Sequence, residues 1–359
     1  MIILTAFAEL PFLGRLVLAL GIAALISFLS TPMVKRMAYK VGAIDVPKDN
    51  RRMHDHPIPR LGGLAIAIAF LLTTFLFCEI DHQMEGVLLG SIVILVLGVL
   101  DDCLTLKALP KFFVQIFAAI IVVMHGCTIR FFTDPFSSVP GAYFDLGILA
   151  GPVTVFWIVL MTNAVNFIDG LDGLAVGVSG ISACTMLVIA LLVAEDNVAV
   201  ILACLLGSCL GFIPYNSNPA KIFMGDTGST FLGFILATMS IQGLFKMYAV
   251  ISFAVPFLIL GVPFFDITFA VTRRLWRHQN PMTADRGHIH HRLIDMGFSQ
   301  KQTVAITYTL TGILGVAAVL LAQSGEVKTL ILIGAVFVVS ILGILVIFGP
   351  RHRPTQKHE

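Results

Sequence analysis

Five aspartates lie in short polar stretches that interrupt a strongly apolar chain. Asp101 and Asp102 follow one apolar run, Asp169 and Asp172 follow a second, and Asp226 precedes a third. Clustered carboxylates repel one another unless a cation lies among them, and oxygen ligands without thiolates suit Mg²⁺ or Mn²⁺. Mg²⁺ usually keeps one or two carboxylates together with water and substrate phosphates. The pattern therefore predicts a phosphate-bearing substrate held by a metal ion.

Glycine-rich turns accompany these aspartates and point to the same chemistry. Segment 169–173 reads Asp-Gly-Leu-Asp-Gly, segment 225–229 reads Gly-Asp-Thr-Gly-Ser, and segment 57–63 reads Pro-Ile-Pro-Arg-Leu-Gly-Gly. Glycine lets the backbone approach a ligand closely, and a helix N-terminus offers free N–H groups to an anion. Arg60, within 57–63, is a candidate partner for a phosphate.

Each motif taken alone also has a purely structural explanation. Asp101 and Asp102 could be solvated residues at the end of a span. Asp169, Asp172 and Asp226 could cap the helices that follow them. Ionisable residues near membrane depth are costly and usually mark function. The occurrence of all these acids at the ends of spans on one face therefore favours a shared site.

The elements that position these residues are membrane spans. Hydrophobic residues make up 57% of the 359 residues and charged residues 12%, which is about half the charge of a typical soluble domain. The mean hydropathy is +0.95. This composition excludes an ordinary soluble protein, a disordered chain and a nucleic-acid binder with a basic surface. The lipid bilayer is the expected partner, and no nucleic acid is expected.

We predict an all-α polytopic membrane protein, because long continuous apolar runs fit helices and not the alternating strands of a barrel. The whole chain, 1–359, is expected to form one integral membrane domain, with a short polar cytoplasmic tail at 350–359. Turn residues within 128–149 predict a small exterior hairpin. About eleven spans are expected, at residues 11–31, 61–79, 86–100, 111–127, 149–165, 174–194, 197–214, 229–246, 248–271, 303–323 and 328–348.

The basic residues orient these spans. Most of the 23 Lys and Arg fall in segments that an eleven-span chain places on one side, among them 32–60, 272–302 and the tail. By the positive-inside rule this side is cytoplasmic. The N-terminus is then outside, while the C-terminus and the aspartates face the cytoplasm.

Several of these motifs, in this order, resemble those of the polyprenyl-phosphate N-acetylhexosamine-1-phosphate transferases. They include the 57–63 turn, Asn-Ala-Val-Asn-Phe-Ile-Asp-Gly-Leu-Asp-Gly at 163–173 and His-Ile-His-His-Arg at 288–292. The resemblance covers essentially the whole chain. The 163–173 and 288–292 forms look like the bacterial branch that starts teichoic acid, O-antigen or enterobacterial common antigen synthesis. The peptidoglycan branch usually carries three consecutive histidines, which Ile289 interrupts here.

The resemblance implies a reaction at the bacterial plasma membrane. GlcNAc-1-phosphate is transferred from UDP-GlcNAc to undecaprenyl phosphate, giving undecaprenyl-pyrophosphoryl-GlcNAc and UMP, as the first membrane step of a cell-envelope polysaccharide such as lipopolysaccharide or teichoic acid. Mg²⁺ is the expected cofactor, with Mn²⁺ as an alternative, and a homodimer is the expected oligomer. The donor could instead be another UDP-amino sugar or UDP-MurNAc-pentapeptide. Direct transfer and a covalent aspartyl intermediate both remain open.

An ion-coupled transporter is the alternative from another class of protein. Transporters place acids near the bilayer midplane in broken helices, often within internal repeats. Here the acids fall at the ends of spans and no clear repeat is visible, which favours the enzyme.

The resemblance also implies residue roles. Asp226 is expected to bind the metal, Phe223 to lie near the uracil, and Asp101 or Asp102 to accept a proton from the lipid phosphate. A zinc site at the histidines is disfavoured, because no cysteine lies nearby and the spacing is unusual. The expected catalytic residues are Asp101, Asp102, Asp169, Asp172 and His290. The expected substrate-binding residues are Arg60, Lys111, Asn166, Asn216, Phe223, Arg286, His288 and His291.

Overall fold

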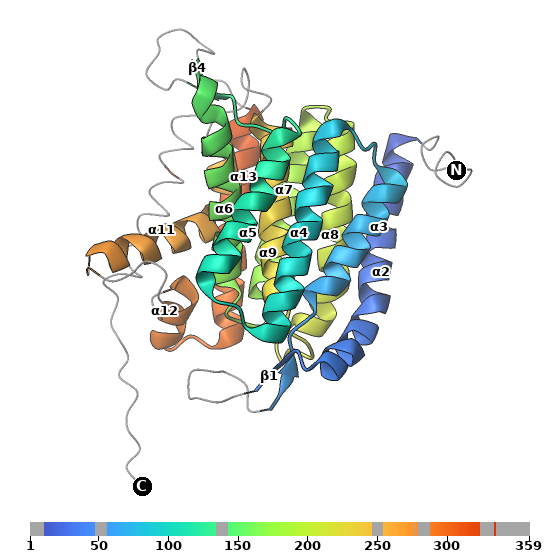
Figure 1. The fold of residues 1–359 in the computed structure, drawn as a ribbon, viewed down its shortest axis with the longest axis vertical. Coiled ribbons are helices and arrows are strands. Elements are labelled where there is room, and N and C mark those ends of the chain that lie inside the picture. Colours follow the sequence, from blue (N-terminus) through green and yellow to red (C-terminus); the bar gives the residue numbers. More distant parts are fainter. Residues whose placement is uncertain are drawn as a thin grey trace.

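The computed structural model describes residues 11–46, 56–133, 143–245, 254–276, 278, 288–323 and 334. The predicted span at 328–348, apart from Gly334, and the tail at 350–359 lie outside these residues, as does Arg286. Most helices run side by side in one bundle (Figure 1). Among the described residues, six helices are long and apolar enough to cross a membrane, so the chain is a polytopic helical membrane protein, as the sequence predicts.

The six long helices are α2 (Phe12–Val41), α4 (His82–Leu104), α6 (Ala150–Ile168, preceded by the 3-10 turn Gly147–Leu149), α7 (Leu174–Leu192), α8 (Asp196–Asn216) and α13 (Gln300–Gln323). The shorter helices are α3 (Gly63–Phe77), α5 (Ala108–Met124), α9 (Gly225–Ser240, extended by the π turn Ile241–Phe245), α10 (Ala254–Ile259), α11 (Gly261–Trp276) and α12 (Ile289–Asp295).

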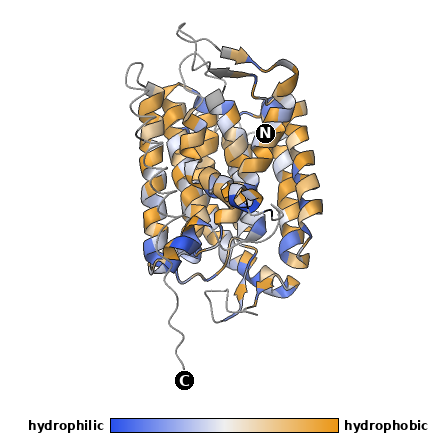
Figure 2. Ribbon diagram, turned by 90° about the vertical axis from the view of Figure 1, so that its left-hand side faces the viewer, coloured by the Kyte–Doolittle hydropathy of each residue, from blue (hydrophilic) through white to orange (hydrophobic). Residues whose placement is uncertain are grey.

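The outer surface of the bundle is apolar over most of its height. Figure 2 shows hydrophobic residues along the helices, with many of the hydrophilic residues toward the lower end of the view. On α2, large side chains such as Leu25, Phe28 and Leu29 remain exposed. In water such a surface would be unfavourable, whereas lipid tails solvate it. The arrangement is that of helices packed within a bilayer.

Small residues bring α2 and α8 into close contact. A side chain on Gly207 or Gly211 of α8 would collide with the carbonyl oxygens of Leu20 and Ala24 on α2. Lipid tails are as apolar as leucine, so membrane helices associate through close packing and not through a hydrophobic driving force. Gly207 and Gly211, four residues apart, allow this close approach of α8 to α2.

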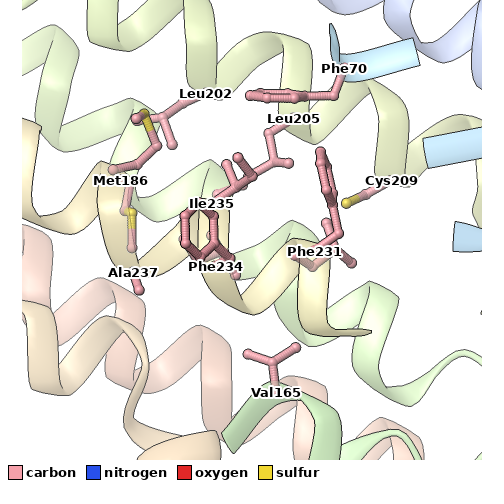
Figure 3. Packing of buried hydrophobic residues seen from close by; sticks show 14 of the residues in the cluster. Phe70, Val165, Met186, Leu202, Leu205, Cys209, Phe231, Phe234, Ile235 and Ala237 are labelled. Atoms are coloured by element: carbon pink, nitrogen blue, oxygen red, sulfur yellow. The ribbon is translucent and has the colours of Figure 1, made fainter. Parts of the chain in front are cut away.

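Helix α9 lies at the centre of the bundle and carries Asp226 on its first turn. Every residue from Thr227 to Ser240 is buried, and α9 packs against α3, α4, α6 and α7. Figure 3 shows Phe231 and Phe234 of this helix among side chains of its neighbours. The ring of Phe231 meets that of Phe70 edge to face at 5.7 Å. Asp226 is therefore attached to a helix that is buried along nearly its whole length.

The predicted span at 248–271 differs from the structure. Its described part consists of two helices, α10 and α11, which meet at Leu260. Pro263 has no N–H group, and its ring crowds the carbonyl four residues earlier, so a proline here breaks a continuous helix. Figure 1 shows α11 running across the direction of the other helices.

The described strands form two small antiparallel sheets, which lie at opposite ends of the bundle (Figure 1). Strands β1 (Ile44–Asp45) and β2 (Ile58–Pro59) pair at one end, where Ile44 faces Pro59. Strands β3 (Phe131–Thr133) and β4 (Tyr143–Asp145) pair at the other end, within the segment where the sequence predicts a hairpin. Strand β2 is the start of the 57–63 turn, so its pairing with β1 holds this turn on one side. The Phe223 N–H donates to the Pro59 carbonyl at 2.8 Å and ties the turn to the segment that precedes α9.

Candidate active site

Asp102, in the last turn of α4, holds the first turn of α9. Its buried carboxylate accepts hydrogen bonds from the backbone N–H groups of Asp226 and Thr227, both at 3.0 Å, and from the Thr227 hydroxyl at 2.6 Å. The first N–H groups of a helix have no partner within it and form its positive end, so a carboxylate stabilises them. Gly225 has φ +71°, and a side chain there would collide with Asp102.

Arg60, in the 57–63 turn, contacts the C-terminal end of α4, close to Asp102. Its Nε and Nη2 atoms donate to the Asp102 carbonyl oxygen at 3.1 and 3.0 Å, and Nη2 also donates to the Thr105 hydroxyl at 3.2 Å. The last carbonyl groups of a helix lack intrahelical partners, and a guanidinium satisfies them. Arg60, which is predicted to bind a phosphate, thus also stabilises the C-terminal end of α4.

Lys111, on the first turn of α5, bridges two of the predicted aspartates. Its Nζ donates to Asp101 Oδ2 at 2.6 Å and to Asp226 Oδ2 at 2.9 Å. The second oxygen of Asp101 accepts the Leu106 N–H at 2.7 Å, and the second oxygen of Asp226 accepts Asn166 Nδ2 at 3.1 Å. Helices α4, α5, α6 and α9 therefore meet at one charged cluster.

The turn between α6 and α7 is tied to the turn between α8 and α9. Asp172 Oδ2 accepts hydrogen bonds from Asn218 Nδ2 at 2.9 Å and from the Ala220 N–H at 3.0 Å. Asn216 accepts the Gly173 N–H at 3.1 Å and donates to the Ile222 carbonyl at 3.0 Å. Asn216 is buried, and both ends of its amide are engaged in this way. These bonds position the loops that surround the site.

Asp169 differs from the other aspartates of the cluster. It is half-buried, and among the described residues its carboxylate has no hydrogen-bond donor. Burial, together with the negative charges of Asp226, Asp102 and Asp172, raises the pKa of the Asp169 carboxyl well above its ordinary value. An uncompensated acid in such a position is a marker of a functional site.

These aspartates surround a cavity of about 280 Å³. Asp45, Asp102, Asp169, Asp172 and Asp226 line it, so five acids from β1, α4, α9 and the α6–α7 turn face one space. The remaining lining residues are Arg60, Gly170, Leu171, Asn216, Phe223, Gly225, His291 and Gln300. The cavity thus offers carboxylates, a guanidinium, an imidazole and an aromatic ring.

A larger, apolar groove of about 850 Å³ lies on the α5 and α6 side of the cluster. Phe112, Ile116 and Ile120 of α5 line one wall, and α6 and α11 contribute further apolar side chains. Gly151 and Pro152, at the start of α6, mark one end of the groove, while Lys111 and Asn166 mark the other. Since α6 spans the bundle, the groove extends along most of its height and ends at the acidic cluster.

The histidine motif is held by Asp266 of α11. His288 Nδ1 lies 2.7 Å from one oxygen of this buried carboxylate, and the Ile289 N–H donates to the other at 2.7 Å. Asp266 therefore caps the start of α12 and fixes the His288 ring. Asp266 was not among the residues predicted from the sequence; a lone acid inside the apolar run 248–271 was the signal that could have identified it.

His290 and His291 occupy different environments. His291 lines the acidic cavity, whereas His290 is buried against Gly170, where any side chain would collide with its ring. Burial and the neighbouring His291 lower the pKa of His290 to about 3, so this imidazole is neutral near pH 7. Its Nε2 atom has no hydrogen-bond partner among the described residues.

The structure brings most of the predicted residues together. Asp102, Asp169, Asp172, Asp226, Arg60, Asn216, Phe223 and His291 line the cavity, while Asp101, Lys111 and Asn166 adjoin it through the bonds to Asp226. His288 and His290 lie behind the cavity wall, and neither lines it. The role assigned to each residue stays a prediction.

The donor set of this cavity fits a divalent cation. Asp169 and Asp226 are carboxylates from different elements that line the same space, and the Asp169 charge lacks compensation among the described residues. No thiol is among the described residues that line the cavity. The carboxylates of Asp169 and Asp226 supply oxygen ligands and leave room for water and phosphate oxygens, which is the environment that Mg²⁺ prefers.

Comparison with known proteins agrees with this architecture. The model of glycosyl transferase family 4 matches residues 84–244. A Bacillus subtilis protein, described as a probable undecaprenyl-phosphate N-acetylglucosaminyl 1-phosphate transferase, is 42% identical over 86% of this chain and 86% of its own length. A decaprenyl-phosphate N-acetylglucosaminephosphotransferase of Mycolicibacterium smegmatis is 32% identical over 90% of this chain and 86% of its own length.

A more distant relative is a phospho-N-acetylmuramoyl-pentapeptide-transferase of Staphylococcus epidermidis, 31% identical over 82% of this chain and 96% of its own length. The fold and the site define a membrane-embedded glycosyl-1-phosphate transferase. The chain belongs to the polyprenyl-phosphate N-acetylhexosamine-1-phosphate transferase family, as its motifs indicate.

Proposed function

We propose that this protein transfers GlcNAc-1-phosphate from UDP-GlcNAc to undecaprenyl phosphate and releases UMP. The observation that carries the proposal is the junction between the two cavities. Lys111 and Asn166 line the apolar groove, and both donate to Asp226, which lines the acidic cavity. A lipid substrate and a water-soluble anion would meet at this junction. The names of the N-acetylglucosaminyl transferases among the relatives support this choice of sugar.

The groove suits the acceptor. Its walls are apolar along α5 and α6, and the described wall carries a positive charge at the end where Lys111 lies. A polyprenyl chain gains contact with the apolar wall, while its phosphate would lie beside the ammonium group and the Asn166 amide. Charge-assisted hydrogen bonds from an ammonium to phosphate oxygens are stronger than neutral ones.

The acidic cavity suits the nucleotide-sugar donor. Phe223 offers an aromatic face for the uracil, and Arg60 and His291 can bind phosphate or sugar oxygens. Arg286 lies two residues before the 288–292 motif that contains His288, and we assign both residues to the donor side as well. Asp172 and Asn216 act by holding the surrounding loops, because their polar atoms bond to the backbone of neighbouring turns.

Mg²⁺, with Mn²⁺ as an alternative, is the proposed cofactor. Asp226 would hold it, and Asp169, which lines the same cavity, would share this task. When bound, such an ion neutralises the charge of the donor pyrophosphate and so lowers the repulsion between two anionic substrates. Asp102 contributes by fixing the first turn of α9, from which the Asp226 side chain projects.

The transfer forms one phosphorus–oxygen bond and breaks another. An oxygen of the lipid phosphate attacks the phosphorus that carries the sugar, and the bridging oxygen leaves with UMP. A phosphate monoester has a second pKa near 6, so the nucleophile is largely deprotonated near neutral pH. Asp101 therefore acts mainly by positioning Lys111, and catalysis depends on alignment and charge stabilisation. A covalent aspartyl route is the competing mechanism.

We also propose the membrane arrangement that the sequence predicts. About eleven spans place the N-terminus and the β3–β4 hairpin outside and the acidic cavity and the C-terminus in the cytoplasm. The support is the positive-inside rule and the location of the two sheets at opposite ends of the bundle. Cytosolic UDP-sugars would then reach the cavity directly. A homodimer is the proposed oligomer.

The test is UMP release by the purified full-length protein with undecaprenyl phosphate and Mg²⁺. We expect release with UDP-GlcNAc, and little with UDP-MurNAc-pentapeptide or UDP-GalNAc. Preferential use of UDP-MurNAc-pentapeptide would instead assign the chain to the activity named for the Staphylococcus epidermidis relative. Absence of UMP release with all three donors would overturn the proposal. Chelation by EDTA should stop the reaction, and added Mg²⁺ should restore it.

A further inference from the structure

A second group of metal-binding side chains lies at the other end of α4. His82 and Glu85 occupy its first turn, and His125 follows the last turn of α5. His82 Nδ1 lies 3.2 Å from Glu85 Oε2, and the rings of His82 and His125 are 4.8 Å apart. One ligand atom from each of the three residues lies within 4.8 Å of the other two.

The backbone holds these side chains close together. A side chain on Gly86 would collide with His125, so this glycine allows the end of α5 to pack directly on α4. Gln83 Nε2 donates to the Gly126 carbonyl at 3.2 Å and ties the same two helix ends. These contacts fix the spacing of the two helix ends that carry His82, Glu85 and His125.

The His125 ring is already oriented for coordination. Its Nδ1 atom lies 2.8 Å from the Ile121 carbonyl oxygen. A carbonyl oxygen can only accept, so Nδ1 carries a proton, and in the neutral imidazole the lone pair is then on Nε2. Metal-binding histidines typically donate their other N–H to a carbonyl or carboxylate in this way, which fixes the tautomer and the ring.

This group is separate from the acidic cavity. His82 opens α4, and Asp101 lies in its last turn. A helix rises 1.5 Å per residue, so these two residues are about 30 Å apart along the axis. None of the three residues lines the cavity or the groove. His82 and Glu85 are exposed, with 71% and 54% of their side chains accessible, so ions can reach them.

We propose that His82, Glu85 and His125 bind a divalent transition-metal ion of the Zn²⁺ type. Two imidazoles and one carboxylate form a nitrogen-rich donor set that suits zinc, while Mg²⁺ and Ca²⁺ prefer oxygen ligands throughout. Three protein ligands leave a position for water or an external ligand. The ion links the start of α4 to the end of α5, and binding to the folded state stabilises the protein by mass action.

The experiment uses the full-length protein in detergent, stripped of metal with EDTA and returned to chelator-free buffer. Thermal unfolding is followed during titration with ZnCl₂, and visible absorption is followed with Co²⁺ as a spectroscopic probe. We expect the Tm to rise with zinc to a plateau, and an excess of Mg²⁺ not to compete. His82→Ala and His125→Ala should each weaken the apparent zinc affinity by about tenfold or more. Glu85→Gln, which keeps the side-chain volume, should weaken it as well.

The matched control is His278→Asn, which alters an exposed histidine just beyond α11. It should retain the zinc-dependent rise in Tm and the cobalt spectrum. All variants should keep Mg²⁺-dependent UMP release, which shows that they are folded. An unchanged Tm of the starting protein with zinc would refute the site. An equal rise in the His82 and His125 variants would also refute it and would assign zinc to the 288–291 histidines or the acidic cavity.

Discussion

The acidic cavity and the apolar groove meet at Asp226, yet they are built in opposite ways. The cavity is formed by short turns whose polar atoms are bonded to one another, as in the three hydrogen bonds accepted by Asp102. The groove is formed by side chains of α5, α6 and α11 that make few directional contacts. Hydrogen bonds fix positions within narrow limits, whereas apolar contacts depend mainly on area.

This difference implies that the two substrates are recognised by different means. Phosphoryl transfer depends on alignment, and small displacements of the reacting groups are costly. A long lipid chain needs only a continuous apolar surface that follows its length. Substitutions in the cavity should therefore have large effects on turnover, and those in the groove small effects on acceptor affinity.

The largest effect is expected at the centre of the cavity. Asp226→Asn keeps the shape of the side chain and removes the proposed metal ligand, so kcat should fall about 10²- to 10³-fold, as when a group that stabilises transition-state charge is removed. UMP release by the purified variant measures this, and its Tm shows whether it is folded. Near-normal turnover in a folded variant would remove Asp226 from the site.

The junction residue should affect the acceptor more than the donor. Lys111→Gln removes the ammonium at the end of the groove, so KM for undecaprenyl phosphate should rise about 10-fold or more, in line with the loss of a charge-assisted bond. KM for UDP-GlcNAc should change much less. Lys107→Gln is the control, because Lys107 is exposed at the start of the same helix. An equal rise in both KM values would contradict the division between the two cavities.

A substitution of Asp169 should change stability and activity in opposite directions. Its raised pKa means that the folded protein binds a proton which the unfolded chain releases near pH 4. In EDTA, stability should therefore decline as pH rises from this value through the raised pKa. Asp169→Asn should lack this part of the decline and have a higher Tm near pH 7, while UMP release falls.

Thermal unfolding at several pH values, with and without Mg²⁺, tests this prediction. Mg²⁺ should raise the Tm of the unaltered protein more than that of the variant, because the ion compensates the Asp169 charge. An Asn variant that is less stable than the unaltered protein at every pH would show that the acid has a structural role.

The smallest effect is expected in the groove. Ile120→Ala removes three carbon atoms from its wall, and the side chain is already 41% exposed. KM for undecaprenyl phosphate should rise only about three- to fivefold, since part of the apolar contact area is lost. The effect should shrink for acceptors with a shorter chain. Leu25→Ala, on the outer face of α2, serves as the control and should leave KM unchanged.

Much of the architecture was predictable because the membrane restricts the choices. Long apolar runs must become helices in lipid, and acids at their ends stand out against an apolar background. The break between α10 and α11 was harder to predict from the sequence, because a proline within an apolar run does not show by how much the direction of the helix changes. Asp266 was missed for a related reason. Its partner His288 lies 22 residues later, and no local pattern links the two.

The sequence by itself determined the class of protein, the helical membrane fold and the group of residues near the site, because residue type, hydropathy and motif order are local properties. Which partner each of these side chains contacts depends on the tertiary structure. Asp101 and Asp102 are neighbours in the chain, yet one bonds to Lys111 and the other caps α9. Successive residues on a helix point in directions about 100° apart, so the surrounding helices determine what each side chain meets.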